Sequence, residues 1–412
     1  MTNAISSVMP LEGYKVIDLS NMLTGPYCTR MLSDYGAEVI KVEPKTGDPA
    51  RMHGPFLNDD PDLEKSGLFL FLNTNKRSIT VDIETEEGQE VIRDLVKDAS
   101  IVVENFKPGY LESLGLGYDA LSAINPNLVM TSITNFGQTG PYKDWEGVDL
   151  TIWAMGGAMK TSGNGDYEPL KMAGRIASFH VGSVASLATL TALWQAEFQD
   201  EGDHVDVPFF ETFMGAIDRH VGQLVGHQYT GNIAPRSIPG SRLAAGARPV
   251  SDGYFLITGG AQGGGRFFQR LMAMLGMEDQ LNEFPWNDRS QYTEQDTIDL
   301  FESFYVPWML EHTKDEVTDL VREYGVLGGA VNTVGDLLSI KQYRERDYWQ
   351  EIEHPVAGSF EYPGYNFRPH GVEMPETRNP APLLGQHTDE VLTDALGYSA
   401  EKIEQLRKSG AV

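Results

Sequence analysis

The first 135 residues alternate strand-like and helix-like segments, and this alternation limits the chain to few folds. Apolar, β-branched runs occupy residues 14–20, 37–44, 100–106 and 127–134, and helical patterns occupy residues 26–36, 86–99 and 118–126. Strands separated by helices of this length pair in parallel, because each crossover returns the chain to the same end of the sheet. The pattern predicts a parallel, Rossmann-like sheet.

The first turn of this pattern lacks the usual phosphate-binding glycines. Only Gly25 occurs there, so the three spaced glycines of a dinucleotide site are missing, and no Gly-Lys-Ser/Thr loop occurs in the chain. These observations argue against NAD and ATP as ligands.

The composition changes near residue 230 of the 412, and two domains are expected for a chain of this length. Helical spacing continues over 179–197 and 208–229, with a short strand between them. Gly, Pro and Arg then become frequent, and the chain ends in two short helices. We expect an α/β protein in which residues 1–229 and 326–412 form a large Rossmann-like domain and 230–325 a smaller α+β domain.

The charge excludes some partners. Lys and Arg number 32 against 59 Asp and Glu, a net charge of −27, so we expect no binding to nucleic acid or to anionic membranes. The sequence shows no apolar run near the ~18 residues of a membrane span. A single cysteine, Cys28, and an N-terminal segment unlike a secretory leader favour the cytoplasm.

Several polar residues are candidates for chemistry. Ser178 and His180 precede a small-residue helix, but positions two apart diverge on a helix, and no Gly-x-Ser-x-Gly motif occurs. A helix cap is the simpler interpretation of Ser178. His220 and His227 share a helix face without the carboxylates of a metal site, so we expect no bound metal.

Three further stretches could meet a ligand. The glycine-rich residues 259–268 could wrap an anion or form only a loop, and the basic pair Lys76 and Arg77 could face a ligand or solvent. Asn105 and Phe106 end a strand at the carboxyl edge of the sheet, where open α/β folds bind ligands.

Six ordered motifs resemble those of the class III CoA-transferases, the family of formyl-CoA transferase and carnitine CoA-transferase. The resemblance covers almost the whole chain and is carried by LEGYKVIDLSNMLTGPYCTRMLSDYGAEVIKVEP, NTNKRSITVDI, VENFKPGYLESLGLGYDAL, NFGQTGPY, GDHVDV and PLLGQHTDEVL. It implies a large domain built from both chain ends, a smaller domain between them, and two subunits interlocked like rings.

The resemblance also implies a mechanism whose nucleophile is absent from this chain. In the family an aspartate at the start of a small-residue helix attacks a CoA thioester, and the mixed anhydride keeps the energy of the thioester. Ser178 occupies the position of that aspartate. Other positions depart from the family as well, since Pro44, Ser113 and Leu23 stand where basic or polar residues are usual.

We therefore expect a CoA-transferase subunit for organic acids that lacks its own nucleophile and acts beside a homologous catalytic subunit, with a homodimer as the alternative arrangement. The CoA thioester would be a substrate rather than a resident cofactor. Two other functions stay open. A racemase would use Asp149, although Val148 replaces its histidine partner; a scaffold would bind CoA without turnover. The residues implied for CoA are Asn105, Phe106, Lys76, Arg77 and Lys107, and for the acyl group Gln138.

Overall fold

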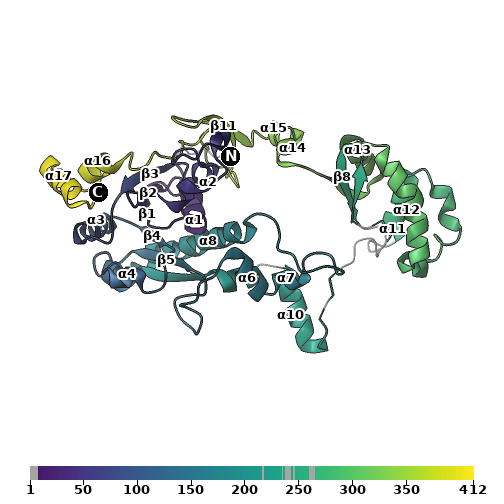
Figure 1. Ribbon diagram of the computed structural model, residues 1–412, viewed down its shortest axis with the longest axis horizontal. Helices are drawn as coiled ribbons and strands as arrows, with labels where there is room; N and C mark the ends of the chain where they lie inside the picture. Colours follow the sequence, from purple (N-terminus) through teal and green to yellow (C-terminus); the bar gives the residue numbers. More distant parts are fainter. Residues whose placement is uncertain (1–7, 216–217, 234, 237–242, 245, 259–264) are drawn as a thin grey trace. The chain divides into compact units, whose positions relative to one another are not determined.

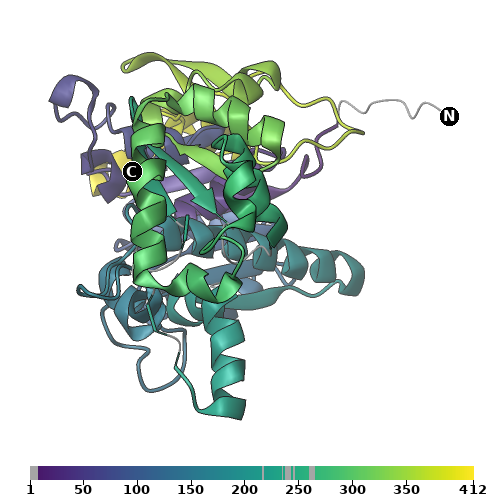
Figure 2. The ribbon, with the colours of Figure 1, turned by 90° about the vertical axis from the view of Figure 1, so that its right-hand side faces the viewer.

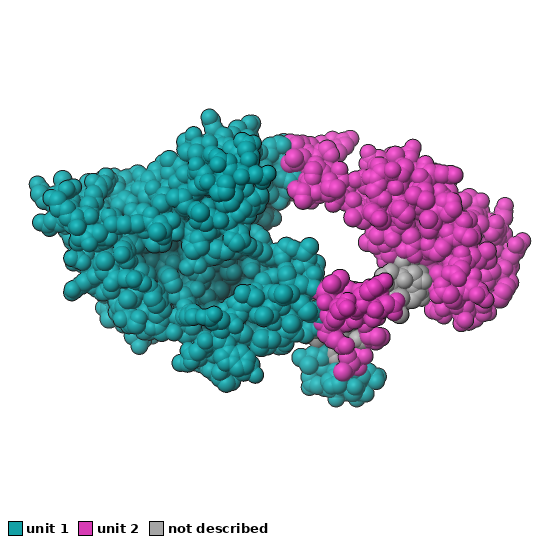
Figure 3. All heavy atoms as spheres, in the orientation of Figure 1, with its two compact units in different colours: residues 1–159, 171–232, 347–412 teal, residues 160–170, 233–346 magenta. Residues whose placement is uncertain are grey.

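The computed structural model describes residues 8–215, 218–233, 235–236, 243–244, 246–258 and 265–412. Its contacts divide the chain into two units, coloured separately in Figure 3. Unit 1 comprises Met1–Met159, Lys171–Asn232 and Asp347–Val412, and unit 2 comprises Lys160–Leu170 and Ile233–Arg346. Both ends of the chain therefore contribute to unit 1.

Unit 1 contains a six-stranded parallel sheet with the order β3-β2-β1-β4-β5-β6 (Figure 1). Its strands are β1 (Lys15–Asp18), β2 (Glu38–Glu43), β3 (Lys76–Thr80), β4 (Ile101–Glu104), β5 (Val129–Thr134) and β6 (Asp203–Pro208). Strands buried on both faces need nearly continuous apolar sequences, which explains the runs seen in the chain. The order reverses between β1 and β4, the place where folds of this type bind ligands. The predicted Rossmann-like sheet is confirmed.

Helices cover both faces of this sheet. The first face packs against α3 (Glu86–Val96), α4 (Tyr110–Ser113), α5 (Tyr118–Ser122), η5 (Val391–Ala395) and α17 (Ala400–Ser409). The second packs against α1 (Thr24–Ser33), α6 (Asp149–Met155), α8 (Ile176–Gln199) and α9 (Phe209–Gly215). Unit 1 also contains η1 (Pro49–Met52), η2 (Leu57–Asp59), α2 (Gly67–Leu72), α10 (Asp218–Thr230), β10 (Trp349–His354), β11 (Gly358–Pro363) and α16 (Thr388–Glu390), and α7 (Ala158–Thr161) lies at the boundary. Neighbouring strand residues point to opposite faces of the sheet, so that Val16 packs in one of the two cores and Ile17 in the other.

Helix α8 differs from the sequence expectation about membranes. Among the described residues it is the one helix long and apolar enough to cross a membrane, with a mean hydropathy of 1.5 over 18 residues and 44% of that window buried. The interspersed Ser, Thr and His hide this run when only uninterrupted apolar stretches are sought. A core helix of a globular protein passes the same test, and α8 packs against α1 and the sheet.

The C-terminal residues return to the first sheet. The N–H of His387 donates to the carbonyl of Ser78 on β3, and the N–H of Asp82 donates to the carbonyl of Ala411. Buried residues of α17 complete the core on that face. This return agrees with the order of elements expected from the sequence.

Unit 2 has a core of its own around an antiparallel sheet, seen in green in Figure 2. Its elements are β7 (Gly246–Val250), β8 (Gly253–Thr258), α11 (Gly265–Met274), η3 (Glu278–Asn282), η4 (Arg289–Thr293), α12 (Gln295–Leu310), α13 (Lys314–Tyr324), β9 (Leu327–Val331), α14 (Val334–Leu337) and α15 (Lys341–Glu345).

The expected domain boundaries need two corrections. Residues 326–346 belong to unit 2, because β9 pairs antiparallel with β8 instead of returning to the parallel sheet. Residues 160–170 also belong to unit 2, because the guanidinium of Arg236 binds the carbonyls of Lys160, Asn164 and Tyr167. Both contacts join residues that are distant in sequence, so no local sequence pattern indicates them.

Candidate functional site

Acidic side chains at the carboxyl ends of β1 and β2 hold the loops that follow them. Asp18 accepts hydrogen bonds from the backbone N–H and the hydroxyl of Ser20. Glu43 accepts one from the N–H of Asp48 at 2.9 Å. These hydrogen bonds connect each strand end to the loop that follows it. They therefore restrict the conformations of the loops at this edge of the sheet.

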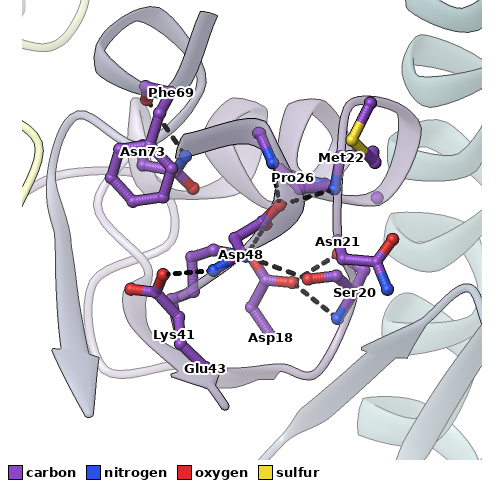
Figure 4. Close-up of polar contacts among 12 residues, drawn as sticks. Asp18, Ser20, Asn21, Met22, Pro26, Lys41, Glu43, Asp48, Phe69 and Asn73 are labelled. Atoms are coloured by element: carbon purple, nitrogen blue, oxygen red, sulfur yellow. Dashed lines mark hydrogen bonds and ion pairs between the residues drawn. The ribbon is translucent and has the colours of Figure 1, made fainter. Parts of the chain in front are cut away.

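A buried ion network of two aspartates and two lysines lies at this edge, and Figure 4 labels three of its members, Asp18, Lys41 and Asp48. The ammonium of Lys76 lies 3.0 Å from Asp18, and the ammonium of Lys41 lies 2.7 Å from Asp48. Lys76 also donates to three oxygens, those of Pro26, Thr29 and Asn73. Burial alone would raise the pKa of Asp18, but Lys76, Lys41 and hydroxyl donors lower it to about 2. All four charges of the network are therefore matched inside the fold.

Two side chains fix the loop after β1. The carboxylate of Asp48 accepts the N–H of Met22 at 2.9 Å, where the backbone has a left-handed φ of 64°. Asn105, after β4, accepts the N–H of Asn21 at 2.8 Å and donates to its carbonyl at 2.9 Å. The loops after β1, β2 and β4 are thus bound to one another on both sides of the point where the strand order reverses.

Two cavities open beside these loops. The larger, of about 460 Å³, we call the Pro44 cavity; it is lined by residues 19–21, 41–46, 48–49 and 81–84 with Phe106 and Tyr110. The smaller, of about 250 Å³, we call the Trp145 cavity; it is lined by Thr24, residues 105–108, 133–135 and 143–146, and Phe209. Phe106 lines both. These volumes can take parts of a drug-sized ligand at the carboxyl edge of the sheet.

The structure brings three of the predicted CoA residues to these cavities. Asn105, Phe106 and Lys107 all line the Trp145 cavity. The ammonium of Lys107 lies 2.5 Å from the carboxylate of Glu146, and both side chains are exposed. An exposed ion pair is weak, so Lys107 can exchange this partner for an anionic ligand at little cost.

The other predicted binding residues lie elsewhere. Lys76 is fully buried, and its four oxygen partners occupy its ammonium. Arg77 pairs with Glu38 and Glu390. Gln138 lines neither cavity; its N–H donates to Asp206 on β6 at 2.9 Å. Lys76 therefore supports the cavity wall from inside the fold.

Ser178 lies in the first turn of α8, partly exposed. His180 is on the same helix, and its Nε2 is buried and has no hydrogen-bond partner among the described residues. The carboxylate of Asp149 lies 2.6 Å from the ammonium of Lys171, which also donates to the carbonyls of Met172 and Gly174. The acid at position 149 is thus paired with a lysine in the segment leading into α8.

Positions that depart from the implied family pattern have ordinary structural roles. Pro44 lines the larger cavity, and Ser113 donates to the carbonyl of Tyr110. Leu23, the residue before α1, is buried in unit 1. None of the three supplies a positive charge.

The remaining candidates are the two histidines of α10 and the glycine-rich stretch. His227 contacts the carbonyl of Asn232, while the side chain of His220 and residues 259–264 of the glycine-rich loop lie outside the described residues. In the described part of the chain, no group of three or more His, Cys, Asp or Glu could hold a metal ion.

Sequence reasoning missed Asn21, Lys41, Asp48 and Tyr110. Each lines the Pro44 cavity. Polar residues directly after β1, on β2 and in the loop following β2 were a usable signal, because the carboxyl ends of neighbouring parallel strands meet at one edge.

Fold and site together are those of an α/β enzyme with its ligand cavities at the carboxyl edge of a doubly wound sheet. The model of CoA-transferase family III matches residues 11–388, and the chain belongs to this family of enzymes. It is 33% identical over 407 residues, 97% of each chain, to succinyl-CoA–D-citramalate CoA-transferase of Chloroflexus aurantiacus. It is 32% identical, again over 97% of each chain, to subunit BbsE of the succinyl-CoA:(R)-benzylsuccinate CoA-transferase of Thauera aromatica.

The fold agrees with solved structures. A CaiB/BaiF family protein from Brucella suis has a TM-score of 0.82 at 31% identity, with 94% of this chain and 99% of that chain covered. The resemblance stated from the motifs is confirmed, and the chain is a class III CoA-transferase or a subunit of one.

Proposed function

We propose that this chain is the subunit without a nucleophile in a heteromeric class III CoA-transferase, and that it binds the CoA thioester of an organic acid. One observation carries the proposal. The first turn of α8, where the family pattern requires an aspartate, presents Ser178. A serine is not ionised at neutral pH and needs a neighbouring base, and His180, two positions further on the helix, points away from it, whereas a carboxylate needs no base.

Asp149 does not replace the missing nucleophile. Its ion pair with Lys171 and the carbonyl contacts of that lysine hold the carboxylate in place. The carboxylate would have to leave this lysine before it could attack a thioester or accept a proton from a substrate. The same pairing argues against a racemase that would use Asp149.

Binding of CoA is supported at the two cavities that share Phe106. Asn105 and Phe106 offer polar and aromatic contacts, and Lys107 offers a cation to a phosphate. Arg77 would have to leave two carboxylates to take part, and Lys76 acts through Asp18. Gln138 is proposed near the acyl group because it follows β5 at the same edge.

The names of the relatives support both the substrate class and the second subunit. Succinyl-CoA appears in the name of the Chloroflexus enzyme and in that of the Thauera enzyme, and the Thauera relative is itself a named subunit. We propose succinyl-CoA as the donor for the complex.

The outer face of α8 supports a partner chain. Leu187, Trp194 and Phe198 recur at helical spacing and are 65%, 69% and 70% exposed. Large apolar groups in such a stripe mark a protein interface. We propose that a homologous chain covers this face in an interlocked dimer.

Catalysis by the chain alone is the decisive test. The purified chain, Ser178→Asp and the control Ser178→Ala are assayed with succinyl-CoA and dicarboxylic acids, beside the complex co-purified from the native source. We expect no turnover by the chain alone or by Ser178→Ala, and turnover by the complex. Partial activity of Ser178→Asp would show an intact pocket; turnover by the wild-type chain alone would refute the proposal.

A further inference from the structure

A buried carboxyl outside the ion network controls the turn that both cavities share. Glu104, the last residue of β4, is 4% exposed and accepts the N–H of Phe106 at 2.7 Å. Ser132 lies opposite it in the β4–β5 register, and its hydroxyl hydrogen-bonds to the same carboxyl. The carboxyl therefore joins the turn to the centre of the sheet.

Two side chains hold the turn after Glu104: Asn105 binds the backbone of Asn21, and Glu104 accepts the N–H of Phe106. Phe106 lines both the Pro44 and the Trp145 cavity. Asn105 exchanges two hydrogen bonds with Asn21, which lines the Pro44 cavity. A shift of the Phe106 N–H consequently moves the walls of both cavities at once.

A second titratable group reaches Glu104 through Ser132. His204 on β6 places its Nε2 2.8 Å from the Ser132 hydroxyl, and its ring stacks on Tyr118 with centroids 5.2 Å apart. A hydroxyl both donates and accepts. Both bonds of Ser132 can therefore reverse when Glu104 gains or loses a proton.

The surroundings of Glu104 contrast with those of Asp18 on the same edge. Asp18 faces Lys76 and Lys41, whereas the charged groups facing Glu104 are Glu112 on α4 and Asp206 on β6. Burial above all, and these two acids in addition, raise the pKa of Glu104 to about 7. Its carboxyl can gain or lose a proton under ordinary conditions.

We propose that Glu104 is a positioning residue whose ionised carboxylate holds the Asn105–Phe106 turn, so that the affinity of this chain for CoA rises with pH around neutrality. A carboxylate accepts an N–H more strongly than a neutral acid does. When Glu104 is protonated, its own O–H must be donated to Ser132, and the bond to Phe106 weakens. The inference rests on the proposed binding of CoA at the shared turn.

The test measures the dissociation constant of coenzyme A by calorimetry between about pH 5.5 and 8.5, a range that brackets the titration of a raised carboxyl and of histidine. The proteins are the wild-type chain, Glu104→Gln and Glu112→Gln. We expect the affinity of the wild-type chain for coenzyme A to rise about tenfold over this range. Glutamine keeps an oxygen for the Phe106 N–H but cannot ionise, so this rise should be absent in Glu104→Gln.

Glu112→Gln is the matched control. It removes a facing negative charge without touching the Phe106 bond, so the rise in affinity should persist and begin at a lower pH. Titration of the CoA phosphates is common to all three proteins and cancels in the comparison. Equal pH dependence in the wild-type chain and Glu104→Gln would overturn the proposal.

A measurement without CoA separates the two proposals. Amide hydrogen exchange of the peptide containing Phe106, corrected for the intrinsic rate, should show protection that increases with pH in the wild-type chain and in Glu112→Gln. If protection increases with pH in this way but calorimetry detects no binding of coenzyme A, the proposed CoA binding is refuted and the role of Glu104 is retained. Glu104→Gln could fail to fold, and two results would then still refute the role of Glu104. One is protection of the Phe106 peptide that does not change with pH in the wild-type chain; the other is a rise in protection that occurs at the same pH in Glu112→Gln as in the wild-type chain.

Discussion

At the scale of single residues, the buried carboxyl groups at the carboxyl edge of the sheet fall into two regions, one with paired lysines and one without. Asp18 and Asp48 are paired with Lys76 and Lys41 inside the fold, and Glu104 lies beside other acids. The paired region holds its loops in one state, because breaking a buried pair leaves an uncompensated charge. The unpaired region can respond to pH.

Asp18→Asn tests the paired region. The substitution leaves the buried ammonium of Lys76 without its counter-charge, so we expect a loss of roughly 3–5 kcal/mol in the free energy of unfolding at neutral pH. Urea denaturation followed by circular dichroism measures it. Lys97→Met, which removes a lysine paired with Asp94 on the surface, should have a much smaller effect.

The pH dependence of this loss has a definite sign. The pKa of Asp18 is lowered from 3.8 to about 2, so its stabilisation is complete above 3.8 and is lost as the pH falls through 2. The difference in the free energy of unfolding between the wild-type chain and Asp18→Asn should therefore become smaller only in strong acid. Equal stability at neutral pH would contradict the role of this pair.

At the scale of elements, the contact between α1 and α8 positions Ser178. A Cβ at Gly182 would lie 2.7 Å from the carbonyl oxygen of Thr24 and 3.1 Å from the ring of Tyr27. Only a glycine allows this approach, and it lies one helical turn after Ser178. Close packing of α8 on α1 thus sets where the first turn of α8 points.

Gly182→Ala should separate the two helices. We expect a loss of about 1–3 kcal/mol in unfolding free energy, since overpacking outweighs the better helix propensity of alanine. Thermal unfolding measures it. Gly226→Ala on α10 is the control, because its Cβ would meet nothing within 4 Å and the substitution should be neutral or slightly stabilising. Similar effects at both sites would rule out the packing explanation.

At the scale of the whole molecule, the exposed stripe on α8 is the interface that we propose for a partner chain. Trp194→Glu places a charge at the centre of this stripe, and we expect it to abolish association with the partner chain. Light scattering after size-exclusion chromatography measures the molar mass. The fold of the variant should be unchanged, since the Trp194 side chain is 69% exposed in the chain itself.

Gln195→Glu is the control for this experiment. It adds the same charge to the neighbouring exposed position and removes no large apolar side chain. Association should survive in this variant. Association of Trp194→Glu at wild-type strength would show that α8 is not the interface.

The amino-acid sequence by itself determined the parallel sheet, the return of the C-terminal helices, and the family. It also located Asn105 and Phe106, because residues that follow strands of a parallel sheet gather at one edge whatever the details of packing. Alternating apolar periods and ordered motifs are local signals, and they remain legible in a single chain.

Only the tertiary structure decided which charges are paired, and where the boundary between the units falls. Lys76 looks like a ligand-binding residue in sequence, yet folding brings it to Asp18, 58 positions away. Likewise β9 joins the small unit through backbone pairing with β8. Ion pairing and strand pairing depend on residues that meet in space, so a pattern of neighbours along the chain does not specify them.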